Sequence, residues 1–461
     1  MPRTQTEWQR LRQRCTTLQY VIKPHHLWSN FFELARIESE TLLHTVQTGF
    51  DVFSSESSAN SLHGLFAEVN FDSFKLGKTH EARNTVLCSI ITEIAPVLSE
   101  TSSDHDLLGD AYEYLISQFA EASGRSSGEF NTPHQISTIM ARIVILDGND
   151  PSVGKRQSMN GLLDFACGSA SLLINVRRQC SPNRIGMIYG QELNRATYNL
   201  ARMNMLIHGI RDSEFQIHHG DSLLNDWDIL NEENPRKRIT CDAIVANPPF
   251  SCRWDPEDIL GEDVRFKDYG LAPTSTADYA FLLHGFRFLS DEGTMALVFP
   301  QGILVRGGIE ETIRTKLLTD GSIDTIIGLP ANLFSSTGIA VCIMVLTKRK
   351  SHDDVLFIDA SQYFEKGRRQ NILLPEHVDK IVDTYQFRKE VEKYSRRVSM
   401  EEIRKNGFNL SIQRYVDTAD EEDVVDLSAV NRSLVDIEAT VQRATARHNQ
   451  FLKELGLPEL P

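Results

Sequence analysis

The chain has 461 residues, of which 41% are hydrophobic and 24% charged, with 27 glycines and 16 prolines. These values are ordinary for a globular protein and exclude collagen-like, low-complexity and wholly disordered chains. The formal net charge is −15, whereas a protein that grips duplex DNA by itself usually carries a basic face. If DNA is a ligand, we therefore expect another chain to make much of the contact, or basic residues to cluster locally.

The seven cysteines include no Cys-x-x-Cys pair. An odd count without this spacing argues against a disulfide framework or a zinc site and favours a reducing compartment. No apolar run approaches the ~20 residues needed to cross a bilayer. The charged N-terminal stretch lacks the apolar core of a secretory signal. We expect a cytoplasmic protein with no membrane partner and no metal.

From the start to about residue 105 the pattern is mostly helical. A second helix is expected over residues 110–121. The segment 81–94 has the spacing of an amphipathic helix, whose expected apolar face holds Val86, Ile90, Ile91 and Ile94.

The middle of the chain has short apolar runs separated by helical stretches. This alternation is typical of βαβ units and a largely parallel sheet. The runs lack strict alternation, which fits a sheet covered on both faces. They span residues 162–165, 187–189, 215–217, 243–245, 295–299, 325–329 and 341–346.

The C-terminal tail carries a seam of mostly apolar residues at alternating spacings of three and four, as on one long helix, interrupted by a histidine at position 448. Such a narrow seam packs either on its own domain or on a partner helix, and the pattern alone favours neither. Its members are Leu427, Val430, Leu434, Ile437, Val441, Ala444, His448, Phe451 and Leu455.

The sharpest chemical signal is Asn247-Pro248-Pro249-Phe250, directly after the apolar run 243–245. Two prolines stiffen the backbone and remove two N–H donors, so carbonyl acceptors are left at the end of a strand, where open α/β sheets bind ligands. The Asn247 oxygen and a neighbouring carbonyl can accept both hydrogens of a planar amino group. This raises electron density on its nitrogen and makes it a better methyl acceptor. Phe250 offers a face on which a base can stack. The alternative is a simple turn that ends the strand.

Three earlier strands end in acidic residues. Asp164 precedes a small-residue turn and a helix that begins near Ser171. Such a turn lets a ligand approach the backbone, and the helix N-terminus favours an anionic group. Glu192 is placed to hold ribose hydroxyls, and Asp221 to receive an adenine amino group. Alone, each could be an ordinary loop carboxylate. Together with Asn247 on the fourth strand they form a more specific set.

These residues resemble the S-adenosylmethionine-dependent amino-methyltransferases that act on adenine N6. Further motifs narrow the resemblance to the modification (M) subunit of type I restriction–modification systems, over roughly residue 60 to the end. They are Tyr112-Glu-Tyr-Leu, Gly128-Glu-Phe-Asn-Thr-Pro, Arg265-Phe-Lys-Asp-Tyr-Gly, Ala277-Asp-Tyr-Ala-Phe, Pro300-Gln-Gly-Ile-Leu, Leu329-Pro-Ala-Asn-Leu-Phe, Thr337-Gly-Ile-Ala and Gly407-Phe-Asn-Leu.

The resemblance implies an α/β fold: a Rossmann-like methyltransferase sheet with an N-terminal helical domain (1–105), a catalytic domain (106–400) and a C-terminal helical tail for subunit assembly (401–461). It implies catalysis by Asn247, Pro248, Pro249 and Phe250 on a flipped base. S-adenosylmethionine is then the cofactor. Its implied binding residues are Glu129, Phe130, Asn131, Thr132, Pro133, Asp164, Ala166, Gly168, Ser169, Ala170, Ser171, Glu192 and Asp221.

The implied partners are DNA, a specificity (S) subunit and a restriction (R) subunit. The implied assembly joins two M subunits to one S subunit, with or without two R subunits.

Two alternatives to this function remain. A protein glutamine-N5 methyltransferase could use the same four acceptor residues, although Tyr is usual in place of Phe250. The second is a scaffold without catalysis, because Ala170 and Ser171 stand where the family loop commonly has glycines. A dehydrogenase has little support without a G-x-G-x-x-G pattern.

Other polar clusters receive an ordinary interpretation. His218-His219 has no second ligand at metal spacing, so a core or surface role is expected. The basic clusters 348–350 and Arg368-Arg369 are expected on a solvated face, with contact to phosphate as the alternative.

Overall fold

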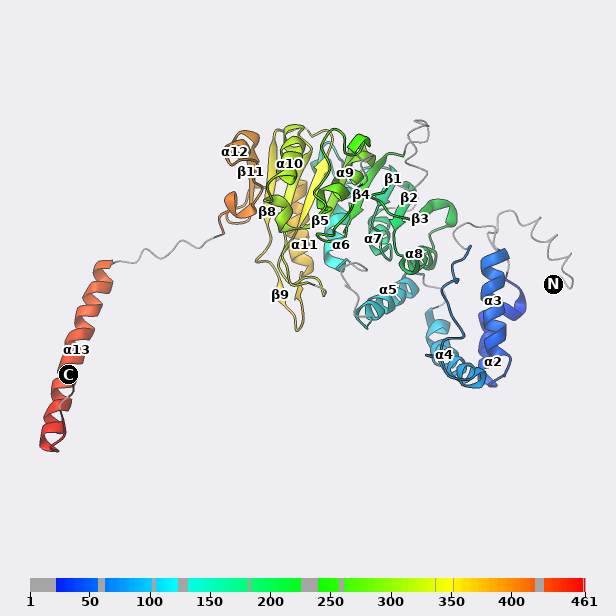
Figure 1. The fold of residues 1–461 in the computed structure, drawn as a ribbon, viewed down its shortest axis with the longest axis horizontal. Helices are drawn as coiled ribbons and strands as arrows, with labels where there is room; N and C mark the ends of the chain where they lie inside the picture. Colours follow the sequence, from blue (N-terminus) through cyan, green and yellow to red (C-terminus); the bar gives the residue numbers. More distant parts are fainter. Residues whose placement is uncertain are drawn as a thin grey trace. The chain divides into compact units, whose positions relative to one another are not determined.

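Figure 1 shows the computed structural model of the chain, which describes residues 22–56, 63–101, 105–122, 132–180, 184–224, 239–256, 261–335, 337–350, 352–418, 427–458 and 460. By its internal contacts the chain divides into two compact units, Met1–Val416 and Asp417–Pro461. No helix in the described ranges is long and apolar enough to cross a membrane.

A nine-stranded sheet forms the centre of the first unit, in the order β11-β8-β6-β7-β5-β4-β1-β2-β3. Strand β7 is antiparallel to both β5 and β6, and β11 is antiparallel to β8, whereas the other neighbours are parallel. Strands β1 to β6 and β8 therefore end at the same edge. The strands are β1 (Met159–Asp164), β2 (Ile185–Glu192), β3 (Phe215–His219), β4 (Cys241–Ala246), β5 (Leu289–Pro300), β6 (Ile323–Gly328), β7 (Val341–Thr347), β8 (Asp354–Asp359) and β11 (Ser395–Ser399).

The predicted α/β sheet is confirmed, and each of the seven apolar runs coincides with a strand, β1 to β7 in chain order. Strands β8 and β11 were not predicted. Neither was a separate antiparallel hairpin formed by β9 (Glu365–Lys366) and β10 (Asn371–Ile372).

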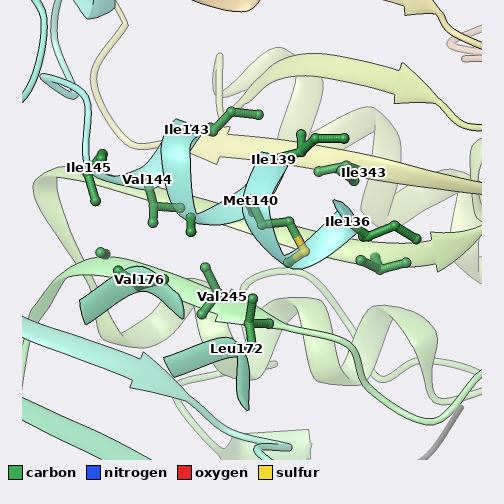
Figure 2. Close-up of a cluster of buried hydrophobic side chains, with 14 of the residues drawn as sticks. Ile136, Ile139, Met140, Ile143, Val144, Ile145, Leu172, Val176, Val245 and Ile343 are labelled. Atoms are coloured by element: carbon green, nitrogen blue, oxygen red, sulfur yellow. The ribbon is translucent and has the colours of Figure 1, made fainter. Parts of the chain in front are cut away.

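Helices cover both faces of the sheet, because successive strand residues point to opposite sides. Val245 joins one core, with α6, α7 and α11, while its neighbour Ile244 joins the other, with α9 and α10. Figure 2 shows the first core, where Ile139 and Met140 of α6 lie over Val245 and Ile343. These helices are α6 (His134–Val144), α7 (Ser171–Gln179), α8 (Arg195–Ile207), α9 (Asp278–Phe288), α10 (Ile309–Thr319), α11 (Pro375–Gln386) and α12 (Met400–Lys405).

The N-terminal region is helical, as predicted, with α2 (Trp28–Arg36), α3 (Leu42–Glu56), α4 (His80–Thr101) and α5 (His105–Ala122). The predicted face of α4 is wrong: Ile91 is buried, but Val86, Ile90 and Ile94 are exposed. The buried face instead includes Asn84, whose Oδ1 accepts the Leu43 N–H at 2.9 Å at the start of α3. A polar capping contact thus orients this helix, and apolar spacing could not reveal it.

The first unit continues beyond the boundary expected at residue 400. Ile403, Leu410, Ile412 and Tyr415 are buried in the second core. The three-domain division stays a prediction, whereas the internal contacts place a division at Val416. The second unit contains α13 (Leu427–Glu454), the predicted long helix. Leu434, Ile437, Val441, Phe451 and Leu455 of the predicted seam are each more than half exposed.

Candidate functional site

The acidic residues and the Asn-Pro-Pro-Phe segment meet at the carboxyl edge of the sheet. Asp164 ends β1 and Glu192 ends β2, while Asn247 directly follows β4. Strand β1 lies between β4 and β2, with Leu163 paired to Ile244. Chain segments far apart in the sequence therefore contribute to one site, as the βαβ pattern predicts.

The loop after β1 is tied to the end of β2. Glu192 accepts the Gly168 N–H through Oε2 at 3.0 Å and the Asn194 N–H through Oε1 at 2.7 Å. Asp164 Oδ1 accepts the Ala166 N–H at 3.0 Å. The two carboxylates thus fix the backbone of the loop, and each oxygen retains further acceptor capacity.

The loop keeps a glycine-like backbone even where alanine replaces glycine. Gly168 has φ 53° and the fully buried Ala170 has φ 66°, both in the left-handed region. This conformation costs alanine about 1 kcal/mol. Ala170 directly precedes α7, and the hydroxyls of Ser169 and Ser171 are hydrogen-bonded at 2.9 Å. The substitution therefore leaves the turn and the helix N-terminus formed.

Asp164 is an unusual carboxyl group because it is only 2% exposed. Burial raises its pKa to about 8, with a further increase from the charge of Glu192, against the opposing Ala166 N–H. Among the described residues, no basic side chain forms an ion pair with Asp164. A cationic amino group beside it would favour its charged form. The acceptors of Asp164 and Glu192 thus fit the amino group and ribose hydroxyls of S-adenosylmethionine.

A buried arginine shapes the loop after β3. The Arg265 guanidinium donates to the carbonyl oxygens of Ser222 at 2.9 Å and Leu223 at 3.0 Å. Asp221 Oδ1 accepts the Leu223 N–H at 2.8 Å, and the Ser222 hydroxyl donates to the Phe165 carbonyl. The loops after β1 and β3 are therefore linked. Asp221 lies in the loop after β3, two residues beyond the end of that strand, and its role at the adenine end of the site stays a prediction.

The segment after β4 has a polar and an aromatic support. Pro248 is buried, and Asn247, Pro249 and Phe250 are half-buried. The ring of Phe250 packs edge-on against Phe334, with centroids 5.6 Å apart. Its face is thereby held in one orientation.

On the polar side, Asp278 at the start of α9 accepts the Ser251 N–H at 2.9 Å. Its second oxygen pairs with Arg306 at 2.6 Å, and Arg306 also pairs with Glu310 at 2.9 Å. Both carboxylates are nearly fully buried. Burial alone would lower the pKa of Arg306, but the two carboxylates outweigh it and raise the value. We call Asp278, Arg306 and Glu310 the support network.

The remaining predicted residues fall into two groups. Thr132 and Pro133 lie immediately before α6, with Pro133 at its N-cap position. Glu129, Phe130 and Asn131 lie outside the described residues. His218 and His219 end β3, and no cluster of metal-ligand type occurs in the ranges that the structure describes.

Sequence reasoning assigned no role to Arg265, Phe334 or the support network. The segments that contain them were noted only because they resemble the family. Local spacing does not show which distant backbone groups a side chain contacts. A charged pair spaced i,i+4 at Arg306 and Glu310, on either side of Gly307-Gly308, was the available signal.

Comparison with known proteins agrees with this geometry. The family model of N-6 DNA methylases matches residues 103–424. The methylase subunit of the type I restriction enzyme MpnII from Mycoplasma pneumoniae is 38% identical over 91% of this chain and 78% of the relative. The MjaVII methylase subunit from Methanocaldococcus jannaschii is 34% identical over 76% of this chain, which spans 60% of that relative.

Solved structures give the same result. The crystal structure of the type I restriction–modification methyltransferase subunit from Streptococcus thermophilus superimposes with a TM-score of 0.80 at 38% identity. The match covers 90% of this chain and 85% of that subunit. The chain belongs to the N-6 DNA methylase family, among the methylase subunits of type I restriction enzymes.

Proposed function

We propose that the chain carries out the reaction of its family, methylation of adenine N6 in DNA by S-adenosylmethionine, at the carboxyl edge of β1 to β4. One observation carries the assignment. Asn247-Pro-Pro-Phe stands beside the loop that Asp164 and Glu192 fix, so an acceptor for an amino group adjoins acceptors suited to the cofactor.

The four catalytic residues act by holding and polarising the base. A base flipped out of the duplex places its amino group against the Asn247 side-chain oxygen and the Pro248 carbonyl. These acceptors draw the two N–H hydrogens toward themselves and increase electron density on the nitrogen. Pro249 restricts the backbone, and Phe250 stacks on the ring, in the orientation that Phe334 maintains.

The remaining site residues hold and orient the cofactor. Asp164 receives the amino group, Glu192 the ribose and Asp221 the adenine end, while the turn 166–171 lets the cofactor approach the backbone. Glu129, Phe130, Asn131, Thr132 and Pro133 are assigned to the cofactor as well, as the resemblance implies. When bound, S-adenosylmethionine supplies an electrophilic methyl group. The contribution of the protein is then chiefly the alignment of nitrogen and methyl, with water excluded by the buried walls.

The chain works in an assembly with DNA, a specificity subunit and a restriction subunit, in which two copies of it share one specificity subunit. Two features support this part of the proposal. The net charge of −15 suits a subunit that leaves most sequence reading to another chain. The exposed apolar seam of α13 has the spacing of a helix that packs against another helix.

The decisive experiment is to purify the chain with its specificity subunit and supply S-adenosylmethionine labelled in the methyl group. We expect label in DNA, located to N6 of adenine by digestion and mass spectrometry. Label in protein glutamine would instead establish the N5 alternative. Absence of cofactor binding by calorimetry would establish the non-catalytic scaffold.

A further inference from the structure

The β9–β10 hairpin carries three exposed basic side chains that form no ion pair within the described part of the chain. Lys366, Arg368 and Arg369 are exposed, and none forms an ion pair with a described residue. They accompany a single acidic residue in the hairpin, Glu365. In a chain with a net charge of −15, such a local excess of positive charge is notable.

The turn geometry places the two arginines at the tip. The Gly367 N–H donates to the Gln370 carbonyl at 3.0 Å, which closes the turn around Arg368 and Arg369. A Cβ on Gly367 would lie 2.4 Å from the same oxygen, so only glycine fits there. Figure 1 shows the hairpin extending beyond the end of the large sheet.

The hairpin is fastened to the loop that follows β6. Asn332 Nδ2 donates to the Arg369 carbonyl at 3.1 Å, and Gln370 Nε2 donates to the Leu333 carbonyl at 3.1 Å. Asn371 Nδ2 donates to the Ala331 carbonyl at 2.8 Å. Side-chain amides on both partners thus hold the tip in place.

This contact links the basic tip to the catalytic edge. Strand β8, which leads into the hairpin, is parallel to β6, so both end at the edge where β1, β2 and β4 end. The loop after β6 also carries Phe334, the residue that packs against Phe250. The Arg369 carbonyl is thus hydrogen-bonded to Asn332, two residues before Phe334, and Phe334 packs against Phe250, the ring proposed to stack on the base.

The other basic cluster, at 348–350, differs in its partners and in its place on the sheet. Arg349 pairs with Asp291 at 2.7 Å, and Lys350 Nζ donates to the carbonyls of Ile323 and Asp354 at 3.0 and 2.8 Å. This cluster follows β7, which is antiparallel to its neighbours and ends at the opposite edge. Its charges serve the fold.

We propose that the tip of the β9–β10 hairpin binds the DNA backbone beside the base that Asn247 holds, with Arg368 and Arg369 on phosphates and Lys366 at the rim. Guanidinium groups suit phosphate oxygens, with two parallel hydrogen bonds each. Such contacts fix the register of the duplex but read no sequence, in keeping with a separate specificity chain. The inference rests on the proposed DNA methylation.

The test uses the complex of this chain with its specificity subunit and an unmethylated duplex that contains the site which the complex methylates. Arg368→Ala/Arg369→Ala should weaken DNA binding at least tenfold at low salt. It should also reduce the magnitude of the slope of log K against log salt by about 1.8, since each lost phosphate contact contributes about 0.9. KM for DNA should rise while kcat at saturating DNA and the cofactor Kd stay near wild type.

Arg349→Ala/Lys405→Ala is the matched control, because it removes two exposed charges that pair with Asp291 and Glu401. Its salt slope should equal that of the wild type. Arg368→Lys/Arg369→Lys should recover most of the slope, and Arg368→Gln/Arg369→Gln replaces the alanine variant if that one fails to fold. An unchanged slope and DNA KM in either the alanine or an Arg→Gln double variant would overturn the inference. A wild-type complex that does not methylate DNA would overturn the proposed function instead.

Discussion

Asp278 Oδ1 accepts the backbone N–H of Ser251, the residue directly after the proposed catalytic segment 247–250, at 2.9 Å. Ser251 has φ 50°, a left-handed conformation that a serine adopts only when its surroundings hold it. The backbone of the proposed catalytic segment is thus anchored to the buried carboxylate of Asp278, which Arg306 neutralises in turn. We therefore expect the support network to position the segment 247–250, since none of its members lies among the proposed catalytic residues.

This arrangement predicts that Asp278→Ala lowers kcat at least tenfold while the cofactor Kd stays within about twofold. Removing one partner of a buried pair also destabilises the fold, by roughly 3 kcal/mol. Steady-state kinetics, calorimetry and thermal unfolding separate the two effects. Asp278→Asn, which retains an acceptor for Ser251, should recover more activity than stability. Equal losses in both would argue for a purely structural role.

Asn247→Ala should abolish methyl transfer and leave cofactor binding nearly intact, because the proposed role of Asn247 is to hold the amino group of the base and not the cofactor. Turnover and calorimetric cofactor affinity are measured on the same preparation. Turnover above a tenth of the wild-type value would remove Asn247 from the role proposed for it.

The buried Asp164 predicts a pH dependence of cofactor binding. With its pKa at about 8, it is protonated in the free site near neutral pH. A cationic amino group favours the carboxylate, so binding releases a proton. Affinity should therefore rise between pH 6 and pH 8, by at most about tenfold per unit. Calorimetry in buffers of different ionisation enthalpy counts the proton released.

The same group affects the free protein in the opposite direction. An unfolded Asp titrates near ~3.9, so the folded state binds more protons between pH 4 and pH 8. Its contribution to stability is present below that window and is lost as pH rises through it. Asp164→Asn should remove both pH dependences. If its profiles match those of the wild type, another group is responsible.

Ile437→Asp should abolish co-purification with the specificity subunit while the melting temperature of the catalytic unit stays within about 1 °C. Ile437 is 59% exposed, so a charge there costs the isolated chain little, but it would be buried unpaired at a helix–helix contact. Ala439→Asp, on the opposite side of α13, is the control and should assemble normally. Retained assembly of Ile437→Asp would mean that the partner contacts another surface.

Local apolar spacing was sufficient to predict seven strands of the sheet and the long helix α13, because burial on both faces leaves a continuous apolar signature. It could not reveal β11, whose Arg396 and Arg397 are exposed, or the two-residue strands of the hairpin. The acidic residues at the ends of the predicted strands indicated that Asp164 and Glu192 lie at the same edge of the sheet. The contacts of Arg265 and Asp278 depend on segments brought together only by the fold, so no local pattern contains them.

Strand β11 is an edge strand of the sheet, and its charged side chains affect how copies of the chain associate at high concentration. Arg396 pairs with Glu402 and Arg397 with Asp354, so an incoming strand would have to bury or displace two guanidinium groups. Such edges resist strand addition and the fibrillar aggregation that begins with it. When copies of this chain are crowded together, strand addition at the β11 edge is thereby disfavoured.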